Sequence, residues 1–382
     1  MEPAFPESEH RDRLDRCRQA LRRAGFNGCI AVAPEHLYYL GGYDAHTHFS
    51  EQALVFSTDR DEPTLLIRDV DVPLAHETSW VRDVRTYHFG ADDPARMVAR
   101  IAREKGLIGK RVGTDLAAYA LPAAYGRRLA QALESSALDD STDVVGKLRV
   151  IKSPREQAYV RQAAGHAKAG LKAAMAKARP GMTEIQLAGE IEYAMRSRGC
   201  DYSAMPTWVA SGPRTPLGHA TPTDRVLERG DLVHVEFAGV ARRYHCVSMQ
   251  TFSLGEPRPR VREICQASRE SVLAGVAAIR PGAPVSGAET ASLEPLAKRG
   301  LRQYAMMRFG VGISAGYPPS WLEPLHIIAE SKDVFQPGMV FYVHTVLEIP
   351  EEGIGTLMGG SYLLTPEGPE QLDGATPELT VL

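Results

Sequence analysis

The feature that most constrains the fold is a pair of segments in which apolar and polar residues alternate. In residues 231–238 every second residue is apolar, so His234 and Glu236 lie together on the opposite face. In residues 340–348 the same alternation predicts one polar face, which carries Tyr342, His344 and Glu348. Such strands predict a sheet with an apolar side and a polar side. Alternation alone leaves open whether the polar side lines a cleft or faces water.

Length and composition narrow the class of protein. The chain has 382 residues, enough for two domains, and a net charge of −3. Because the basic and acidic residues nearly cancel, the surface cannot be generally basic, and we expect no nucleic-acid partner. No apolar run is long enough to span a membrane, and the N-terminus lacks the apolar core of a secretory signal. The five cysteines lack paired metal-binding spacing and are typical of reduced thiols in a cytoplasmic protein.

The two halves of the chain differ in pattern. Residues 1–145 alternate short apolar segments with amphipathic helices, which predicts a small α/β layer domain. A linker is expected at 138–145, where acidic residues, Ser and Thr cluster. Residues 146–382 begin with helices that match N-terminal capping patterns, with Ser153 and Thr183 as the N-caps.

Six short motifs follow one another along the chain. They are 34–43 (PEHLYYLGGY), 148–156 (LRVIKSPRE), 179–181 (RPG), 230–233 (GDLV), 337–341 (PGMVF) and 364–368 (LTPEG). In this order and spacing they resemble the creatinase/prolidase/methionine-aminopeptidase superfamily, whose catalytic fold is called pita-bread. The resemblance implies an α/β protein of two domains. A small creatinase-type N-terminal α/β domain at 1–145 would precede a pita-bread α+β catalytic domain at 146–382.

Metal-dependent members of the superfamily hold two divalent ions. The resemblance implies which positions of this chain correspond to their metal ligands. Those members use two Asp, one His and two Glu, and the five positions fall here at Glu236, Val247, Val311, His344 and Gly359. Valine and glycine side chains cannot donate a lone pair to a metal, so we expect no dinuclear site and no cofactor. One alternative stays open. A mononuclear site could be rebuilt from Glu236, His245 and His344, because imidazole and carboxylate suit zinc.

A loop at 211–220 (SGPRTPLGHA) resembles the segment in which the whole superfamily carries a histidine. In creatinase, which needs no metal, that histidine is the catalytic acid/base, and the resemblance assigns this role to His219. Glu236 and His344 complete the predicted catalytic set, because they can hold a charged group or polarise a carbonyl. We expect a metal-independent hydrolase, or a lyase, that cleaves a C–N bond of a small polar, amino-acid-derived substrate. A non-catalytic ligand-binding protein on the same fold is the second alternative.

Further residues are expected to bind the substrate. Segment 316–323 (GYPPSWLE) is similar to one in ectoine hydrolases, but Pro324 and Met249 replace residues of ectoine hydrolase and creatinase, so the substrate itself is not predicted. In creatinase-like dimers a loop of the N-terminal domain reaches the partner's active site. That loop falls here at 44–50, and the resemblance implies a homodimer. The predicted substrate-binding residues are Trp208, His245, Tyr317, Trp321, Tyr342, Glu348, His46 and His48.

Overall fold

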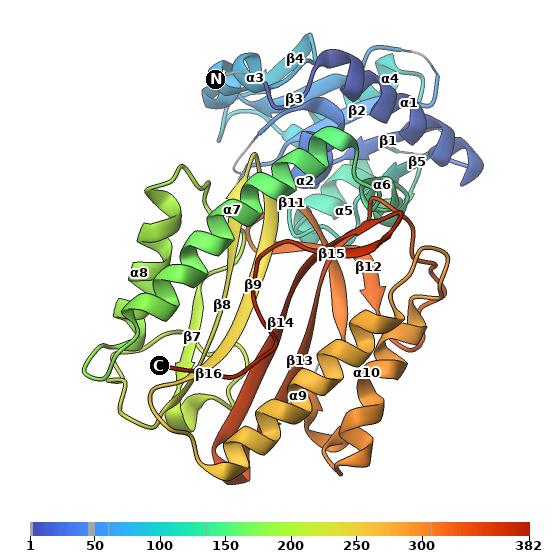
Figure 1. The fold of residues 1–382 in the computed structure, drawn as a ribbon. Helices are drawn as coiled ribbons and strands as arrows, with labels where there is room; N and C mark the ends of the chain where they lie inside the picture. Colours follow the sequence, from blue (N-terminus) through green and yellow to red (C-terminus); the bar gives the residue numbers. More distant parts are fainter. Residues whose placement is uncertain (1–2, 45–49, 60, 135, 307) are drawn as a thin grey trace. The chain divides into compact units, whose positions relative to one another are not determined.

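The computed structural model describes residues 3–44, 50–59, 61–134, 136–306 and 308–382. The chain divides between Arg149 and Val150 into two compact units (Figure 1). The boundary predicted after residue 145 falls inside helix α6 (Thr142–Arg149). This helix belongs to the first unit because Val145 is buried in a core with Leu14 and Leu21.

The first unit is a six-stranded sheet with helices packed against both faces. The strand order is β4-β3-β2-β1-β5-β6, and β1 runs antiparallel to β2 but parallel to β5. Neighbouring residues of β1 enter two separate cores, since Cys29 packs with α1 and Ile30 packs with α4. The strands are β1 (Gly28–Ala31), β2 (Ala53–Ser57), β3 (Thr64–Arg68), β4 (Asp83–Tyr87), β5 (Arg111–Thr114) and β6 (Ala137–Asp140). The helices besides α6 are α1 (Glu7–Arg23), α2 (Pro34–His36), α3 (Val72–Thr78), α4 (Pro94–Glu104) and α5 (Ala123–Ala132).

The linker predicted at 138–145 is wrong, because β6 and α6 occupy this stretch. The polar residues there serve the start of the helix. The carboxylate of Asp140 accepts hydrogen bonds from the N–H of Thr142 at 3.0 Å and from its hydroxyl at 2.6 Å. A cluster of Asp, Ser and Thr therefore marks a strand-to-helix turn here and not a flexible connection.

The second unit is a ten-stranded sheet. Seven of its strands follow the order β12-β11-β13-β14-β9-β8-β7, while β10 pairs with β13, β15 with β14 and β16 with β9. Figure 1 shows α7, α9 and α10 over one side of this sheet. The predicted N-caps Ser153 and Thr183 are confirmed as capping boxes. The helices are α7 (Pro154–Lys177), α8 (Glu184–Arg196), α9 (Pro259–Ala278) and α10 (Ser286–Lys298). The strands are β7 (Trp208–Ser211), β8 (Leu232–Ala241), β9 (Tyr244–Ser253), β10 (Ala305–Met306), β11 (Gly310–Tyr317), β12 (Ser320–Ile327), β13 (Val340–Ile349), β14 (Ile354–Thr365), β15 (Gly368–Gln371) and β16 (Thr380–Val381).

The alternation predicted for β8 and β13 is confirmed. In β8 the apolar side chains of Val233, Val235 and Phe237 are buried in a core with residues of α8. In β13 Phe341 and Val343 are buried in a second core. The polar residues between them therefore lie on the side of the sheet that faces away from these cores.

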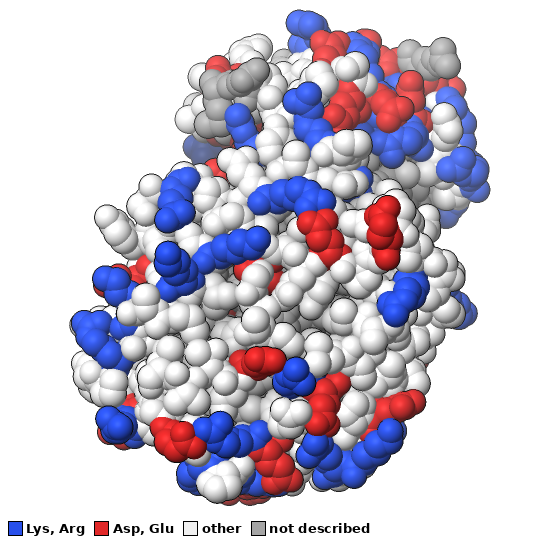
Figure 2. Space-filling view, viewed as in Figure 1, with Lys and Arg blue, Asp and Glu red and all other residues white. Residues whose placement is uncertain are grey.

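Two observations concern membrane and nucleic-acid partners. Among the described helices none is both long and apolar enough to cross a membrane. On the face shown in Figure 2, basic and acidic side chains are interspersed.

Candidate active site

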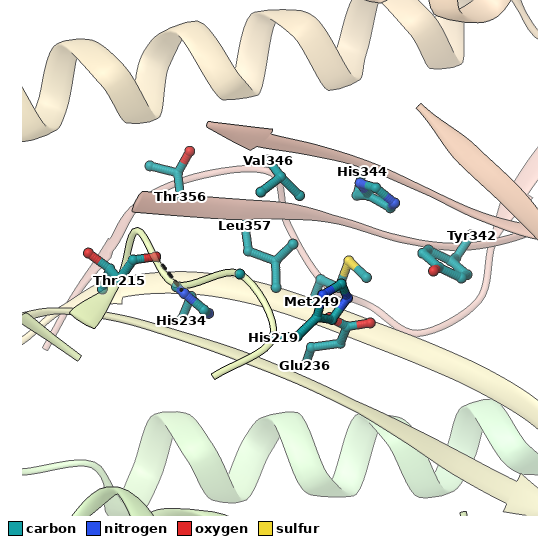
Figure 3. A pocket seen from close by; sticks show the side chains of 11 residues that line it. Thr215, His219, His234, Glu236, Met249, Tyr342, His344, Val346, Thr356 and Leu357 are labelled. Atoms are coloured by element: carbon teal, nitrogen blue, oxygen red, sulfur yellow. Dashed lines mark hydrogen bonds between the residues drawn. The ribbon is translucent and has the colours of Figure 1, made fainter. Parts of the chain in front are cut away.

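The polar sides of β8 and β13 line one pocket, together with β9, β14 and the loop that follows β7 (Figure 3). His219, Glu236 and His344, the residues predicted to be catalytic, all line it, and so does Tyr342. The structure thus brings together side chains from segments far apart in the sequence. The other lining residues are Thr215, Gly218, His234, Met249, Val346, Thr356 and Leu357.

The loop that carries His219 is tied at both ends to the start of α8. The buried carboxylate of Glu184 accepts the N–H of Ser211 at 2.9 Å and the N–H of Thr223 at 3.0 Å. The guanidinium of Arg214, within the loop, donates to the same carboxylate. Because both ends of the loop are fixed, His219 is held at the pocket by contacts outside it.

His219 lies between an aromatic ring and solvent. Its ring meets Trp208 edge to face, with 5.3 Å between ring centroids. The preceding N–H, that of Gly218, donates to the carboxylate of Glu348, whose pKa is raised by burial. A Cβ at Gly218 would lie 2.5 Å from Oε1 of Glu348, so a larger residue would displace this carboxylate. The imidazole itself is exposed and can exchange protons with water.

Glu236 is a buried carboxyl group without a cationic partner. Its side chain is 4% exposed, and among the described residues nothing forms a hydrogen bond or ion pair with it. Burial raises the pKa of Glu236 to about 8, so the group is protonated at neutral pH. A neutral carboxyl can donate a hydrogen bond, and it loses its proton readily when a cation approaches.

Two further imidazoles in the pocket are buried and neutral. Burial lowers the pKa of His234 to about 4, and burial followed by the charge of Arg308 lowers that of His344 to about 3. His234 donates from Nε2 to the carbonyl oxygen of Thr215 at 3.0 Å. Within the described part of the chain, Nδ1 of each ring has no hydrogen-bond partner. Sequence reasoning missed His234 as a site residue, although the alternation that indicates Glu236 applies equally to it.

The predicted binding role of His245 needs correction. Its Nε2 accepts the N–H of Ala204 at 3.0 Å, and its Nδ1 faces the carbonyl oxygen of Ser314 at 3.3 Å. The side chain is fully buried and does not line the pocket. Both ring nitrogens thus pair with backbone groups, so His245 joins the loop before β7 to strand β11.

Three of the predicted aromatic residues, Trp208, Tyr317 and Trp321, are not among the residues that line the pocket. Trp321 is 1% exposed and packs against Trp208 with 5.9 Å between ring centroids. Tyr317 is buried, and its ring lies 4.8 Å from the guanidinium carbon of Arg243. Of these three rings, Trp208 is the one that packs against a described residue of the pocket lining, His219. The predicted residues His46 and His48 lie outside the described residues.

Comparison with known protein families identifies the family of this chain. The model of metallopeptidase family M24 matches residues 158–366, and the model of the creatinase/prolidase N-terminal domain matches residues 13–151. The chain belongs to metallopeptidase family M24. The predicted fold, a creatinase-type domain followed by a pita-bread domain, is confirmed, as is the coarse expectation of a hydrolase that acts on C–N bonds.

Relatives of this M24 protein carry names of several activities. An uncharacterized hydrolase/peptidase of Sinorhizobium fredii is 28% identical over 99% of this chain and 98% of its own length. The ectoine hydrolase of Halomonas elongata is 26% identical over 96% of each chain. The solved dipeptidase PepE of Mycobacterium ulcerans is 28% identical, with a TM-score of 0.87 over 99% of each chain.

The residues of this M24 protein do not fit the pair of metal ions that the family name implies. Val247 and Val311 are fully buried and offer no donor atom. At Gly359 a Cβ would overlap the carbonyl oxygen of Val343 and lie 2.7 Å from Cα of His344, so no larger side chain fits. Among the described residues no group of three or more His, Cys, Asp or Glu could hold a metal. The alternative of a mononuclear site from Glu236, His245 and His344 is therefore not supported by their placement.

Proposed function

We propose that this M24 protein is a metal-independent hydrolase, or a lyase, that cleaves a C–N bond of a small polar, amino-acid-derived substrate. The observation that carries the proposal is the placement of His219, Glu236 and His344 in one pocket, whose described residues do not provide the family's set of metal donors. An imidazole, a neutral carboxyl and a second imidazole supply proton transfer and hydrogen bonds without a Lewis acid.

The proposed chemistry assigns one task to each side chain. His219 takes a proton from the attacking water and returns it to the leaving nitrogen, because an imidazole nitrogen can both accept and donate a proton. Glu236 is protonated in the free pocket and donates a hydrogen bond where negative charge develops on the substrate. The N–H of neutral His344 supplies a second donor, which polarises a carbonyl or holds a carboxylate.

The test is a metal analysis combined with an activity screen. Protein purified without chelator is expected to hold well under one transition-metal equivalent per chain. Release of ammonia or amine from a panel of amino-acid amides, amidines and dipeptides is then measured before and after chelation. Activity that survives chelation supports the proposal. A stoichiometric metal, or activity that is lost on chelation and restored by manganese, cobalt or zinc, contradicts it.

A dipeptide-cleaving activity is the second candidate. It is favoured by the solved dipeptidase that matches 99% of this chain at 28% identity. The same panel separates the two candidates, because a dipeptidase would release amino acids from dipeptides and leave the amides and amidines intact.

We also propose that the protein is a homodimer, because its first unit matches the creatinase/prolidase N-terminal domain, which packs on a partner in creatinase-like enzymes. Sedimentation at micromolar concentration tests this proposal. A stable monomer would contradict it.

A further inference from the structure

The imidazole of His234 has a hydrogen-bonding position that the described residues leave open. The side chain is 2% exposed, and its Nε2 lies 3.0 Å from the carbonyl oxygen of Thr215. Because a carbonyl oxygen can only accept, the ring proton is on Nε2. Burial lowers the pKa of His234 to about 4, so the ring is neutral at neutral pH and Nδ1 carries a lone pair. Nδ1 is therefore a hydrogen-bond acceptor, and none of the described residues donates to it.

A buried acceptor of this kind needs a donor. Leaving a buried polar atom without a partner costs free energy, so such atoms in folded proteins commonly bind an ordered water molecule. The free space in the pocket that His234 lines is about 10 Å³, which is enough for about one water molecule. Glu236 and His219 line the same space and offer further polar partners. The position thus has the size and the chemistry of a site for one water.

His234 is fixed relative to the predicted catalytic residues. It precedes Glu236 by two positions on β8, so both side chains project from the same face of this strand (Figure 3). Thr215, which accepts its Nε2–H, belongs to the loop that carries His219. The hydroxyl of Thr215 also accepts the N–H of Gly355 at 3.0 Å, which attaches this loop to β14. A water on Nδ1 of His234 is therefore placed between β8 and the loop of His219.

We infer that Nδ1 of His234 holds the water that attacks the substrate, which makes His234 a further catalytic residue. This inference rests on the proposed function in its hydrolase form. The water donates one hydrogen to Nδ1 of His234 and the other to His219, so that a lone pair of its oxygen is free to attack the carbon of the C–N bond.

Atoms and protons balance in this step. As the C–O bond forms, His219 takes one proton from the water, and it delivers that proton to the nitrogen as the C–N bond breaks. The second hydrogen of the water stays on the new hydroxyl group and remains hydrogen-bonded to Nδ1 of His234. His234 itself neither gains nor loses a proton, which agrees with a buried neutral ring.

The first experiment locates the water and does not require a substrate. A crystal structure of the ligand-free protein, at a resolution that shows ordered waters, is expected to contain a water within hydrogen-bond distance of Nδ1 of His234. The same water is expected to be absent from the structure of His234→Gln. A wild-type structure without a water at this nitrogen overturns the inference.

Two substitutions then separate the two nitrogens of the ring. His234→Gln places an amide N–H near the position of Nε2, so it keeps the bond to Thr215 and loses the acceptor at Nδ1. His234→Asn places an amide oxygen near the position of Nδ1, so it keeps the acceptor and loses the bond to Thr215. We expect His234→Gln to melt near the wild-type temperature and to lower kcat by about 10- to 100-fold with little change in KM. His234→Asn is expected to melt at a lower temperature and to retain more turnover than His234→Gln.

A purely structural role of His234 predicts the reverse order of turnover, because the Thr215 bond would then be the one that matters. Full turnover of His234→Gln, or less turnover in His234→Asn than in His234→Gln, overturns the inference. His166→Gln is the matched control with expected wild-type kcat. His166 is also a buried imidazole with one ring nitrogen unpartnered among the described residues, but it lies on α7 and does not line the pocket.

Failure of the proposed function is recognised by different measurements. Turnover that requires an added metal contradicts the proposed function, whereas the water on His234 and the order of the two variants are measured with or without metal. Reaction in water labelled with oxygen-18 tests the attack itself. We expect one labelled oxygen in the product, and a product without label would show a lyase and overturn the role of His234.

Discussion

Each of the two units buries an acidic side chain, but the two carboxyl groups are in opposite situations. In the first unit Asp115 is fully buried and accepts hydrogen bonds from the N–H of Val32 at 2.7 Å and of Ala33 at 2.9 Å. Its other oxygen lies 2.8 Å from Nδ1 of His36. In the second unit Glu236 is almost as deeply buried and has no such partner among the described residues.

The pKa values follow from this difference. Burial acts to raise the pKa of Asp115, but His36 and the two N–H donors outweigh it and hold the pKa below its usual value. For Glu236 burial acts alone, and the pKa rises to about 8. The protein completes the environment of Asp115 by itself, which is typical of a structural role. It leaves that of Glu236 incomplete, which is typical of a site that a ligand completes.

The largest effect is expected on turnover, in the pocket of the second unit. His219→Asn should lower kcat by roughly 10²–10⁴, because asparagine keeps a polar group but cannot cycle a proton near neutral pH. Stability should change little, since the side chain is exposed. His76→Asn is the control, as His76 is exposed on α3 of the other unit. Steady-state kinetics on a substrate from the screen provide the measurement, and near-normal turnover of His219→Asn would refute the assignment.

The next effect concerns the free energy of unfolding. Asp115→Ala should lower it by about 3–5 kcal/mol, because it leaves His36 and two buried N–H groups without their acceptor. Glu236→Gln should change it by less than about 1 kcal/mol at pH 5, where the carboxyl is already neutral and no partner is lost. Urea denaturation of both variants at pH 5 measures the contrast. Equal losses would remove the distinction between the two carboxyl groups.

A smaller and graded effect is expected of pH on the free energy of unfolding. The pKa of Glu236 rises from 4.5 to about 8 on folding, so its contribution to stability is fully present below pH 4.5 and is lost as pH rises toward 8. Glu236→Gln should therefore gain stability relative to the wild type between pH 5 and pH 8, by at most about 1.4 kcal/mol per pH unit. Asp115 has the opposite sign, because its lowered pKa gives stability above about pH 4 that is lost in more acidic solution. Urea midpoints between pH 5 and pH 8 test the sign for Glu236, and midpoints below pH 4 test the sign for Asp115. A flat difference for Glu236→Gln would contradict a raised pKa.

Much of the site could be predicted because its signals are local. Period-two alternation assigned the faces of β8 and β13 correctly, and the structure places His234, Glu236, Tyr342 and His344 at the pocket. His245 was also predicted to bind the substrate, yet it does not line the pocket. Alternation specifies a face, whereas the backbone groups of Ala204 and Ser314 that bind His245 come from a loop and from strand β11, both distant in the sequence.

The amino-acid sequence by itself determined the family, the two-domain fold, the strand faces and the residue types of Val247, Val311 and Gly359, whose side chains offer no metal donor. These properties depend on residue type and spacing along the chain, so they can be read without coordinates. Only the tertiary structure decided that Glu236 is buried without a partner among the described residues, and that His245 is engaged by backbone groups. Those properties depend on which distant segments meet, because hydrogen bonding and burial are set by neighbours in space and not by neighbours in sequence.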